Sequence, residues 1–181
     1  MKKITITLLL LSMTVLSGCF GGDEEVIPLQ NGYKTGEFQI NTPEGWEIFT
    51  KNYFTSDIPK NTELILRSKK KDEVFIANIN VTRNIVADDI SSEDYAKKLL
   101  QSSSILFLNF KKINEKKINQ NGYLVAYQGK QKAGDPLLEF IQHVVVKDKK
   151  IFIATLAYNP ADDEQVKKEA AEIISSLTAI P

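Results

Sequence analysis

The chain has 181 residues, of which 43% are hydrophobic and 25% are charged, and its 23 basic residues balance its 23 acidic ones. This length and composition are typical of one folded domain, and they exclude a disordered chain. The balanced charge argues against a general nucleic-acid binder, and one Cys with one His excludes a disulfide framework and a Cys/His zinc cage.

The N-terminus has the layout of a secretory signal. Lys2 and Lys3 precede an apolar run over 4–15, which is too short to span a bilayer core comfortably. The following Leu16-Ser17-Gly18-Cys19 resembles the lipobox of bacterial lipoproteins, in which small residues precede the Cys that begins the mature chain. The resemblance implies that residues 1–18 are removed as a signal peptide and that Cys19 carries a thioether-linked diacylglycerol. The alternatives are a plain secretory signal with an incidental Cys and a buried Cys in a cytosolic protein.

Cleavage would remove two lysines, leaving 21 basic against 23 acidic residues and a formal charge of −2. The anchor would place the protein on the extracytoplasmic face of the cell membrane or the outer membrane. Residues 19–35 contain Gly21-Gly22, a run of three acids and Pro28, and they show no helical or strand period. They are therefore predicted to form a flexible tether, followed by one domain over 36–181.

Most of this domain is predicted to be strand. Phe38 and Ile40 alternate with polar residues, a turn with Pro43 and Gly45 follows, and the alternation then resumes, which indicates a hairpin over 37–49. Further strands are predicted from alternation or from apolar runs, and the short connections between the last four make them antiparallel. These strands are 64–67, 73–82, 110–118, 122–130, 137–147 and 150–158.

Two amphipathic helices are predicted. The first has Ser91 as its N-cap, with Asp94 three residues later. Its apolar face contains Tyr95, Ala96, Leu99, Leu100, Ser103, Leu106 and Phe107. The second has Asn159 as its cap and Pro160 at its first position. Its apolar stripe contains Val166, Ala170, Ile173, Ile174 and Leu177.

The predicted strand 137–147 is apolar on both faces. Leu138 and Phe140 lie on one face, whereas Leu137 and Ile141 lie on the other. Such a strand needs cover on both sides. The sequence therefore predicts an α+β fold, a three-layer α/β/α sandwich with a central antiparallel sheet and one helix on each face.

A family resemblance supports this architecture. The pattern Phe38-x-Ile40-x-x-Pro43-x-Gly45-Trp46, the mid-chain helix, the closing strands and the last helix resemble the PsbP-like fold over 36–177. The resemblance implies a docking or assembly accessory, since that family includes such proteins and many of unknown role. A fold does not by itself establish a function.

Two groups of residues invite a chemical interpretation. His143 is the only imidazole and would suit a general base, but a sheet histidine hydrogen-bonded to a neighbour is favoured because no nucleophile adjoins it. Asp88-Asp89 could join a metal or peptide site, yet a solvated loop before the helix is favoured. None of the serines lies in a hydrolase motif.

Lysines cluster mainly at predicted turns, where solvent accommodates them. Several on one rim would face anionic lipid or an acidic partner. The clusters are Lys69-Lys70-Lys71, Lys111-Lys112, Lys116-Lys117, and Lys147 with Lys149-Lys150.

The sequence thus predicts a lipid-anchored extracytoplasmic protein that acts as a non-catalytic binding or assembly module. It predicts an envelope protein partner, no nucleic acid, no cofactor, and no catalytic or metal-binding residue, with lipid attachment at Cys19. An extracytoplasmic hydrolase with an unrecognised site and a small-ligand or metal binder are the alternatives.

Overall fold

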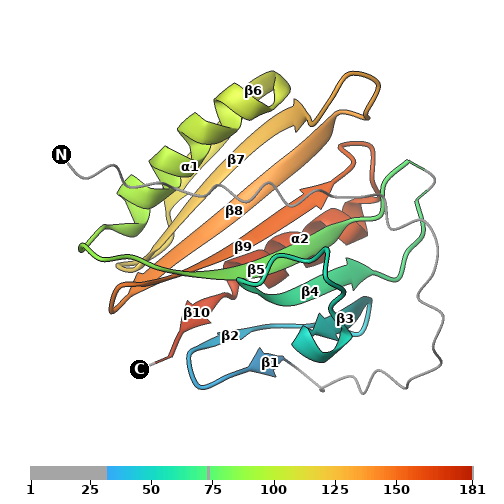
Figure 1. Cartoon of the computed structure of the whole chain (residues 1–181). Coiled ribbons are helices and arrows are strands. Elements are labelled where there is room, and N and C mark those ends of the chain that lie inside the picture. Colours follow the sequence, from blue (N-terminus) through green and yellow to red (C-terminus); the bar gives the residue numbers. More distant parts are fainter. Residues whose placement is uncertain (1–31, 73, 181) are drawn as a thin grey trace.

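The computed structural model describes residues 32–72 and 74–180 (Figure 1). The predicted signal peptide, Cys19 and residues 20–31 lie outside the described residues. Tyr33 and Lys34, which the sequence assigned to the tether, form strand β1 (Tyr33–Lys34), and the Tyr33 ring packs against the core. The folded body therefore begins before Gly36.

A seven-stranded antiparallel sheet forms the centre of the molecule, with the strand order β3-β4-β5-β9-β8-β7-β6. Strands β7 to β9 are where the sequence predicted them within one residue, and β6 begins two residues earlier than predicted. The bounds are β3 (Trp46–Thr50), β4 (Thr62–Ser68), β5 (Asn78–Ile85), β6 (Leu108–Lys117), β7 (Gly122–Lys130), β8 (Leu138–Lys147) and β9 (Lys150–Tyr158).

One helix covers each face of this sheet, which confirms the predicted three-layer α+β fold (Figure 1). Helix α1 (Ser92–Leu106) packs on β6, β7 and β8, and α2 (Glu164–Ser175) packs on β8 and β9. Strand β8 serves both sides because its side chains alternate. Val144 joins the cluster beneath α1, whereas Ile141 and Val145 join the cluster beneath α2.

The predicted hairpin over 37–49 is wrong. Its turn exists, because the amide of Trp46 donates to the carbonyl of Pro43 (3.1 Å). However, β2 (Phe38–Ile40) pairs with β1 and with the C-terminal β10 (Thr178–Ala179) in a separate three-stranded sheet, and β3 pairs with β4. A short 3-10 helix, Lys51–Tyr53, follows β3. The turn thus carries the chain from one sheet to the other, and both flanking strands bury side chains in one core.

Helix capping follows the sequence at one helix and departs from it at the other. The Ser91 hydroxyl accepts from the amide of Asp94 (3.0 Å), as predicted for α1. At α2 the cap is Asp163, whose carboxylate accepts from the amide of Gln165 (2.9 Å), so the predicted Asn159 cap is wrong. Asn159 instead closes a separate turn by accepting from the amide of Asp162 (2.8 Å).

Strand β5 also begins later than the predicted 73–82. The Asp72 carboxylate accepts from the amides of Val74 (2.7 Å) and Phe75 (2.8 Å), which bends the chain away from the sheet. The strand then extends to Ile85. Its alternation holds, because Ile79 and Val81 are buried in the core beneath α2.

Candidate functional site

His143 lies in the core and not in a site open to solvent. Its side chain is fully buried on the α2 side of β8, and its Nδ1 atom is 2.9 Å from the carbonyl oxygen of Ile174. A carbonyl only accepts, so Nδ1 carries the proton and donates. Burial lowers the pKa of His143, which keeps the ring neutral. The interpretation of His143 as a hydrogen-bonded sheet histidine is confirmed.

The other ring nitrogen of His143 faces the turn between β6 and β7. Nε2 is buried without a hydrogen-bond partner, and a Cβ atom added to Gly122 would lie 2.7 Å from it and 3.1 Å from the Asn119 Oδ1. Gly122 therefore makes room for the ring. A general base needs a proton to abstract within reach, and here Nε2 is buried against the backbone of Gly122 without a hydrogen-bond partner.

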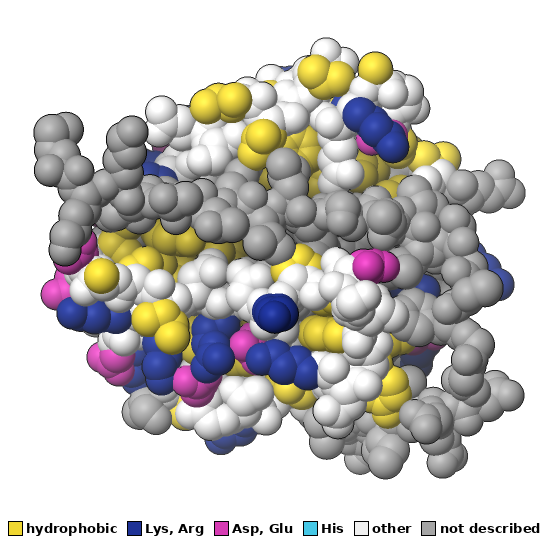
Figure 2. Space-filling view, viewed as in Figure 1, with side chains coloured by type: hydrophobic (Ala, Val, Ile, Leu, Met, Phe, Trp, Pro, Cys, Tyr) yellow, Lys and Arg dark blue, Asp and Glu magenta, His cyan; other side chains and the backbone are white. Residues whose placement is uncertain are grey.

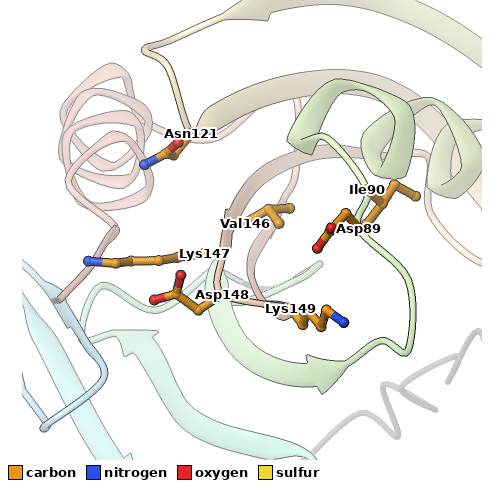
Figure 3. A pocket seen from close by; sticks show the side chains of 7 residues that line it. All are labelled: Asp89, Ile90, Asn121, Val146, Lys147, Asp148 and Lys149. Carbon is orange, nitrogen blue, oxygen red and sulfur yellow. The ribbon is translucent and has the colours of Figure 1, made fainter.

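A pocket with polar walls lies at the end of the sheet where three connections meet (Figure 3). We call it the three-turn pocket, and its volume is about 340 Å³. It is formed by the loop before α1, the β6–β7 turn and the β8–β9 turn. Its lining residues are Asp89, Ile90, Asn121, Val146, Lys147, Asp148 and Lys149.

Backbone hydrogen bonds hold the three connections together. The amide of Val146 donates to the carbonyl of Asn121 (3.0 Å), and the amide of Val86 donates to the carbonyl of Lys149 (3.0 Å). The side chain of Asn119 accepts from the amide of Asn121 (2.9 Å) and braces the β6–β7 turn. The pocket therefore rests on the ordered end of the sheet.

The β8–β9 turn contributes a strained residue to this pocket. Asp148 and Lys149 have φ angles of 49° and 62°, the left-handed conformation that a two-residue hairpin turn of this hand requires. Asn or Asp followed by Gly is preferred there, so Lys at the second position is unfavourable. Lys149 thus adopts a backbone conformation that glycine would adopt at lower energetic cost.

The chemistry of the pocket is that of recognition. Asp89 and Asp148 supply carboxylates, Lys147 and Lys149 supply ammonium groups, and Asn121 supplies an amide that both donates and accepts. Ile90 and Val146 add apolar surface. A balanced set of this kind suits a ligand or protein segment that carries charges of both signs.

Asp88 and Asp89, which the sequence singled out together, have different environments in the structure. Asp89 lines the three-turn pocket, whereas Asp88 is exposed and is not among the lining residues. Within residues 32–72 and 74–180, no group of three or more His, Cys, Asp or Glu side chains is placed to hold a metal ion.

The lysine clusters have several different environments. Lys70 pairs with Asp163 (2.8 Å) and Lys150 pairs with Glu37 (2.7 Å), so both join distant parts of the chain. Lys147 and Lys149 line the three-turn pocket. Lys111 and Lys112 lie on β6, at the edge of the sheet.

The sequence analysis did not predict a row of polar residues that crosses three strands of the sheet. Asn80, Thr155 and Gln142 are successive cross-strand neighbours on β5, β9 and β8. Gln142 Nε2 donates to the Thr155 hydroxyl (3.3 Å), while Gln142 Oε1 is buried without a partner. The signal was present, because the polar residues of β5 alternate with Ile79 and Val81.

No protein-family model matches the chain, and none of the curated proteins compared with it matches significantly. Within the described residues, no helix combines the length and the apolar character needed to cross a bilayer.

Solved structures do resemble it. Cyanobacterial PsbP from Synechocystis is 14% identical with a TM-score of 0.59, covering 92% of this chain and 99% of its own. LpqN of Mycobacterium tuberculosis, described as involved in cell envelope biogenesis, is 17% identical with a TM-score of 0.53, covering 80% and 83%. The Ran-binding protein Mog1p of Saccharomyces cerevisiae is 9% identical with a TM-score of 0.54, covering 78% and 89%. At these identities the likeness establishes a shared PsbP- and Mog1-like fold.

Proposed function

We propose that this protein is a lipid-anchored, extracytoplasmic binding or assembly module of a bacterial envelope, held in place by acyl chains on Cys19. The structural observation that carries the binding role is the contrast between His143 and the three-turn pocket. The single imidazole is engaged with the Ile174 carbonyl inside the core, whereas residues of both charges line the surface pocket. The exposed polar chemistry is therefore suited to holding a partner.

Two further observations support the proposal. The Leu16-Ser17-Gly18-Cys19 segment resembles a lipobox, which supports the anchor. The fold is shared with LpqN, a protein described as involved in cell envelope biogenesis, and with a Ran-binding protein, which supports a binding role. Anchoring would keep a weak binder close to membrane partners at high effective concentration.

Mass spectrometry of the protein purified from native membranes tests the anchor. We expect a mature chain that begins at Cys19 and carries a diacylglycerol thioether. An uncleaved leader, or a free thiol at Cys19, would contradict the anchor and would leave the pocket to be tested separately.

Partner capture from intact envelopes tests the binding role. We expect the double variant Asp89→Asn and Lys149→Gln to lose most of the captured partner, because it removes one charge of each sign from the pocket. The matched control is Asp57→Asn with Lys60→Gln, an equally conservative change at exposed residues outside the pocket. Cys19→Ser should also lower the amount of captured partner, because without its anchor the protein is no longer concentrated near the membrane. Capture that all three variants leave unchanged would refute the proposed role.

A small-ligand binder is the second candidate, and the pocket volume of about 340 Å³ favours it. A thermal-shift screen with zwitterionic small molecules and with divalent cations separates the two candidates. A ligand that raises the melting temperature of the native protein, and not that of the Asp89→Asn and Lys149→Gln variant, would favour the small-ligand function.

A further inference from the structure

Large apolar side chains stand exposed where α1 ends. Ile105 is 79% exposed, Leu106 38%, Leu108 48% and Leu137 37%. We call these four residues the apolar corner. Figure 2 shows hydrophobic side chains gathered along the upper edge of the molecule, where Figure 1 places the end of α1. The sequence predicted Leu106 to lie on the buried face of the helix, and this expectation is wrong.

The packing of Phe107 explains why its neighbours point outward. The Phe107 ring lies 4.8 Å from the Phe140 ring and 5.6 Å from the Tyr127 ring, between centroids. A Cβ atom added to Gly129 would lie 2.7 Å from the Cβ of Phe107, so the chain is held tightly against β7. With Phe107 directed inward, the residues on either side of it are turned toward solvent.

Strand register brings the members of the corner together. Leu108 is the cross-strand partner of Lys130 on β7, and the adjacent Gly129 is the partner of Leu138 on β8. Leu137 therefore lies just before β8, near the end of α1 and the start of β6. This end of the sheet lies opposite the three-turn pocket, because β6 and β8 both run from the corner toward the pocket.

Three lysines lie close to the apolar corner along the chain or across the sheet. Lys130 is paired with Leu108, and Lys132 and Lys111 follow within three residues of these two. None of these three lysines forms an ion pair within the part of the chain that the structure describes. The nearby Asp135 accepts a hydrogen bond from the backbone amide of Lys132 (3.1 Å). Apolar side chains with lysines nearby complement an anionic bilayer surface.

We propose that the apolar corner rests on the anionic bilayer in which the anchor is inserted, so that the domain has a second membrane contact. This inference rests on the proposed anchor at Cys19. Residues 20–31 separate Cys19 from the described domain, and a random chain of that length has an r.m.s. reach of about 20 Å. The tether therefore keeps the domain as a whole close to the bilayer, where a basic apolar patch would supplement the acyl chains.

The contact would orient the domain. A strand of ten residues spans roughly 30 Å at about 3.3 Å per residue. With the corner on the membrane, the three-turn pocket at the far end of the strands faces away from it. The orientation would present the pocket to partners that lie some distance above the bilayer.

Fluorescence of the acylated protein in vesicles tests this orientation. Acylation occupies the thiol of Cys19, the only Cys in the chain, so a thiol introduced elsewhere is labelled alone. Ile105→Cys places a polarity-sensitive dye at the corner, and Ile85→Cys is the matched control. Ile85 is 73% exposed and ends β5 beside the pocket, because the next amide, that of Val86, donates to Lys149.

In vesicles with about a third anionic lipid, we expect the Ile105→Cys dye to shift to the blue and to be quenched by nitroxide lipids, whereas the Ile85→Cys dye stays in water. Adding Lys130→Gln and Lys132→Gln to the labelled protein should lower the ratio of docked to undocked domain by about fivefold per lysine.

Equal solvent exposure of the two dyes on a protein whose acylation is verified would overturn the inference and leave the anchor intact. Docking that is the same on uncharged vesicles would also overturn it. If the corner dye is buried only in native envelopes, a protein covers the corner and the inference is wrong. A protein that is not acylated at all refutes the proposed anchor itself.

Discussion

The Nδ1 atom of His143 donates to the carbonyl oxygen of Ile174 over 2.9 Å, which joins the centre of the sheet to the last turn of α2. The last carbonyls of a helix have no partner within the helix, and His143 satisfies one of them from the neighbouring layer. The ring is neutral because burial lowers its pKa. A second proton could enter only at the buried Nε2 atom, and burial opposes that charge, so the stability of the fold depends on pH.

Stability should fall as the pH drops below about 6.5, the pKa of an unperturbed histidine. Below that value His143 is protonated in the unfolded chain but stays neutral in the folded chain. The free energy of unfolding therefore decreases as the pH falls, with a slope of at most about 1.4 kcal/mol per pH unit. Urea unfolding at several values between pH 5 and 7.5 measures the slope. His143→Gln should reduce this slope. The contribution of the carboxylates is the same in both proteins, so it drops out of the difference between the two slopes. Identical slopes in the two proteins would contradict this assignment.

Gly122→Ala should destabilise the fold by about 1–3 kcal/mol, the usual cost of overpacking. The added Cβ would lie 2.7 Å from His143 Nε2. Gly36→Ala is the control, because nothing lies within 4 Å of a Cβ there. Chemical denaturation of both variants checks the prediction. In the double variant with His143→Ala, the penalty for Gly122→Ala should largely vanish. If Gly122→Ala costs as much stability in the His143→Ala background, the clash with the His143 ring is not the cause of the destabilisation.

Lys149→Gly should raise stability by about 0.5–1 kcal/mol, since glycine relieves the left-handed conformation but adds entropy to the unfolded chain. The φ angle of Lys149 is 62°. Thermal melts of Lys149→Gly and Lys149→Ala distinguish backbone strain from the loss of the ammonium group. Only glycine should stabilise, because alanine has the same backbone restriction as lysine. Equal melting temperatures for the two variants would argue against strain.

Replacing Gln142 and Thr155 together by Met and Val should leave stability unchanged or raise it by about 1 kcal/mol. A half-buried polar pair that is poorly satisfied contributes little, and the buried Oε1 atom of Gln142 has no partner. Thr155→Val alone should cost about 1 kcal/mol, because it removes the acceptor of the Gln142 amide. Unfolding in urea gives both values. A double variant that is less stable than Thr155→Val would show that the row is structurally required.

The sequence predicted the layers well because local patterns determine them. Strands β7 and β9 are largely apolar runs of nine residues each, and Ser91 with Asp94 marks the start of α1. Strand β8 is apolar on both faces, and this alone required a helix on each side. These signals are contained within about ten neighbouring residues.

The features that the sequence did not predict depend on residues that are distant from each other in the chain. Phe38 and Trp46 flank a turn, yet the partner of β2 on one side is β10, about 140 residues away. Likewise, Asp89 meets the residues of the three-turn pocket only because the strand registers bring three connections to one end of the sheet. No local pattern encodes such a meeting. His143 could be placed on a face from sequence, but its contact with Ile174 crosses between layers.

The pairing of β2 between β1 and β10 ties the two ends of the described domain to each other, in the register Tyr33↔Ile40 and Phe38↔Ala179. A chain emerging from the ribosome or from a translocation channel cannot complete this small sheet until Thr178 and Ala179 have emerged. Strand β2 therefore stays unpaired along one side until then. Loss of residues 178–179 would leave that side of β2 open.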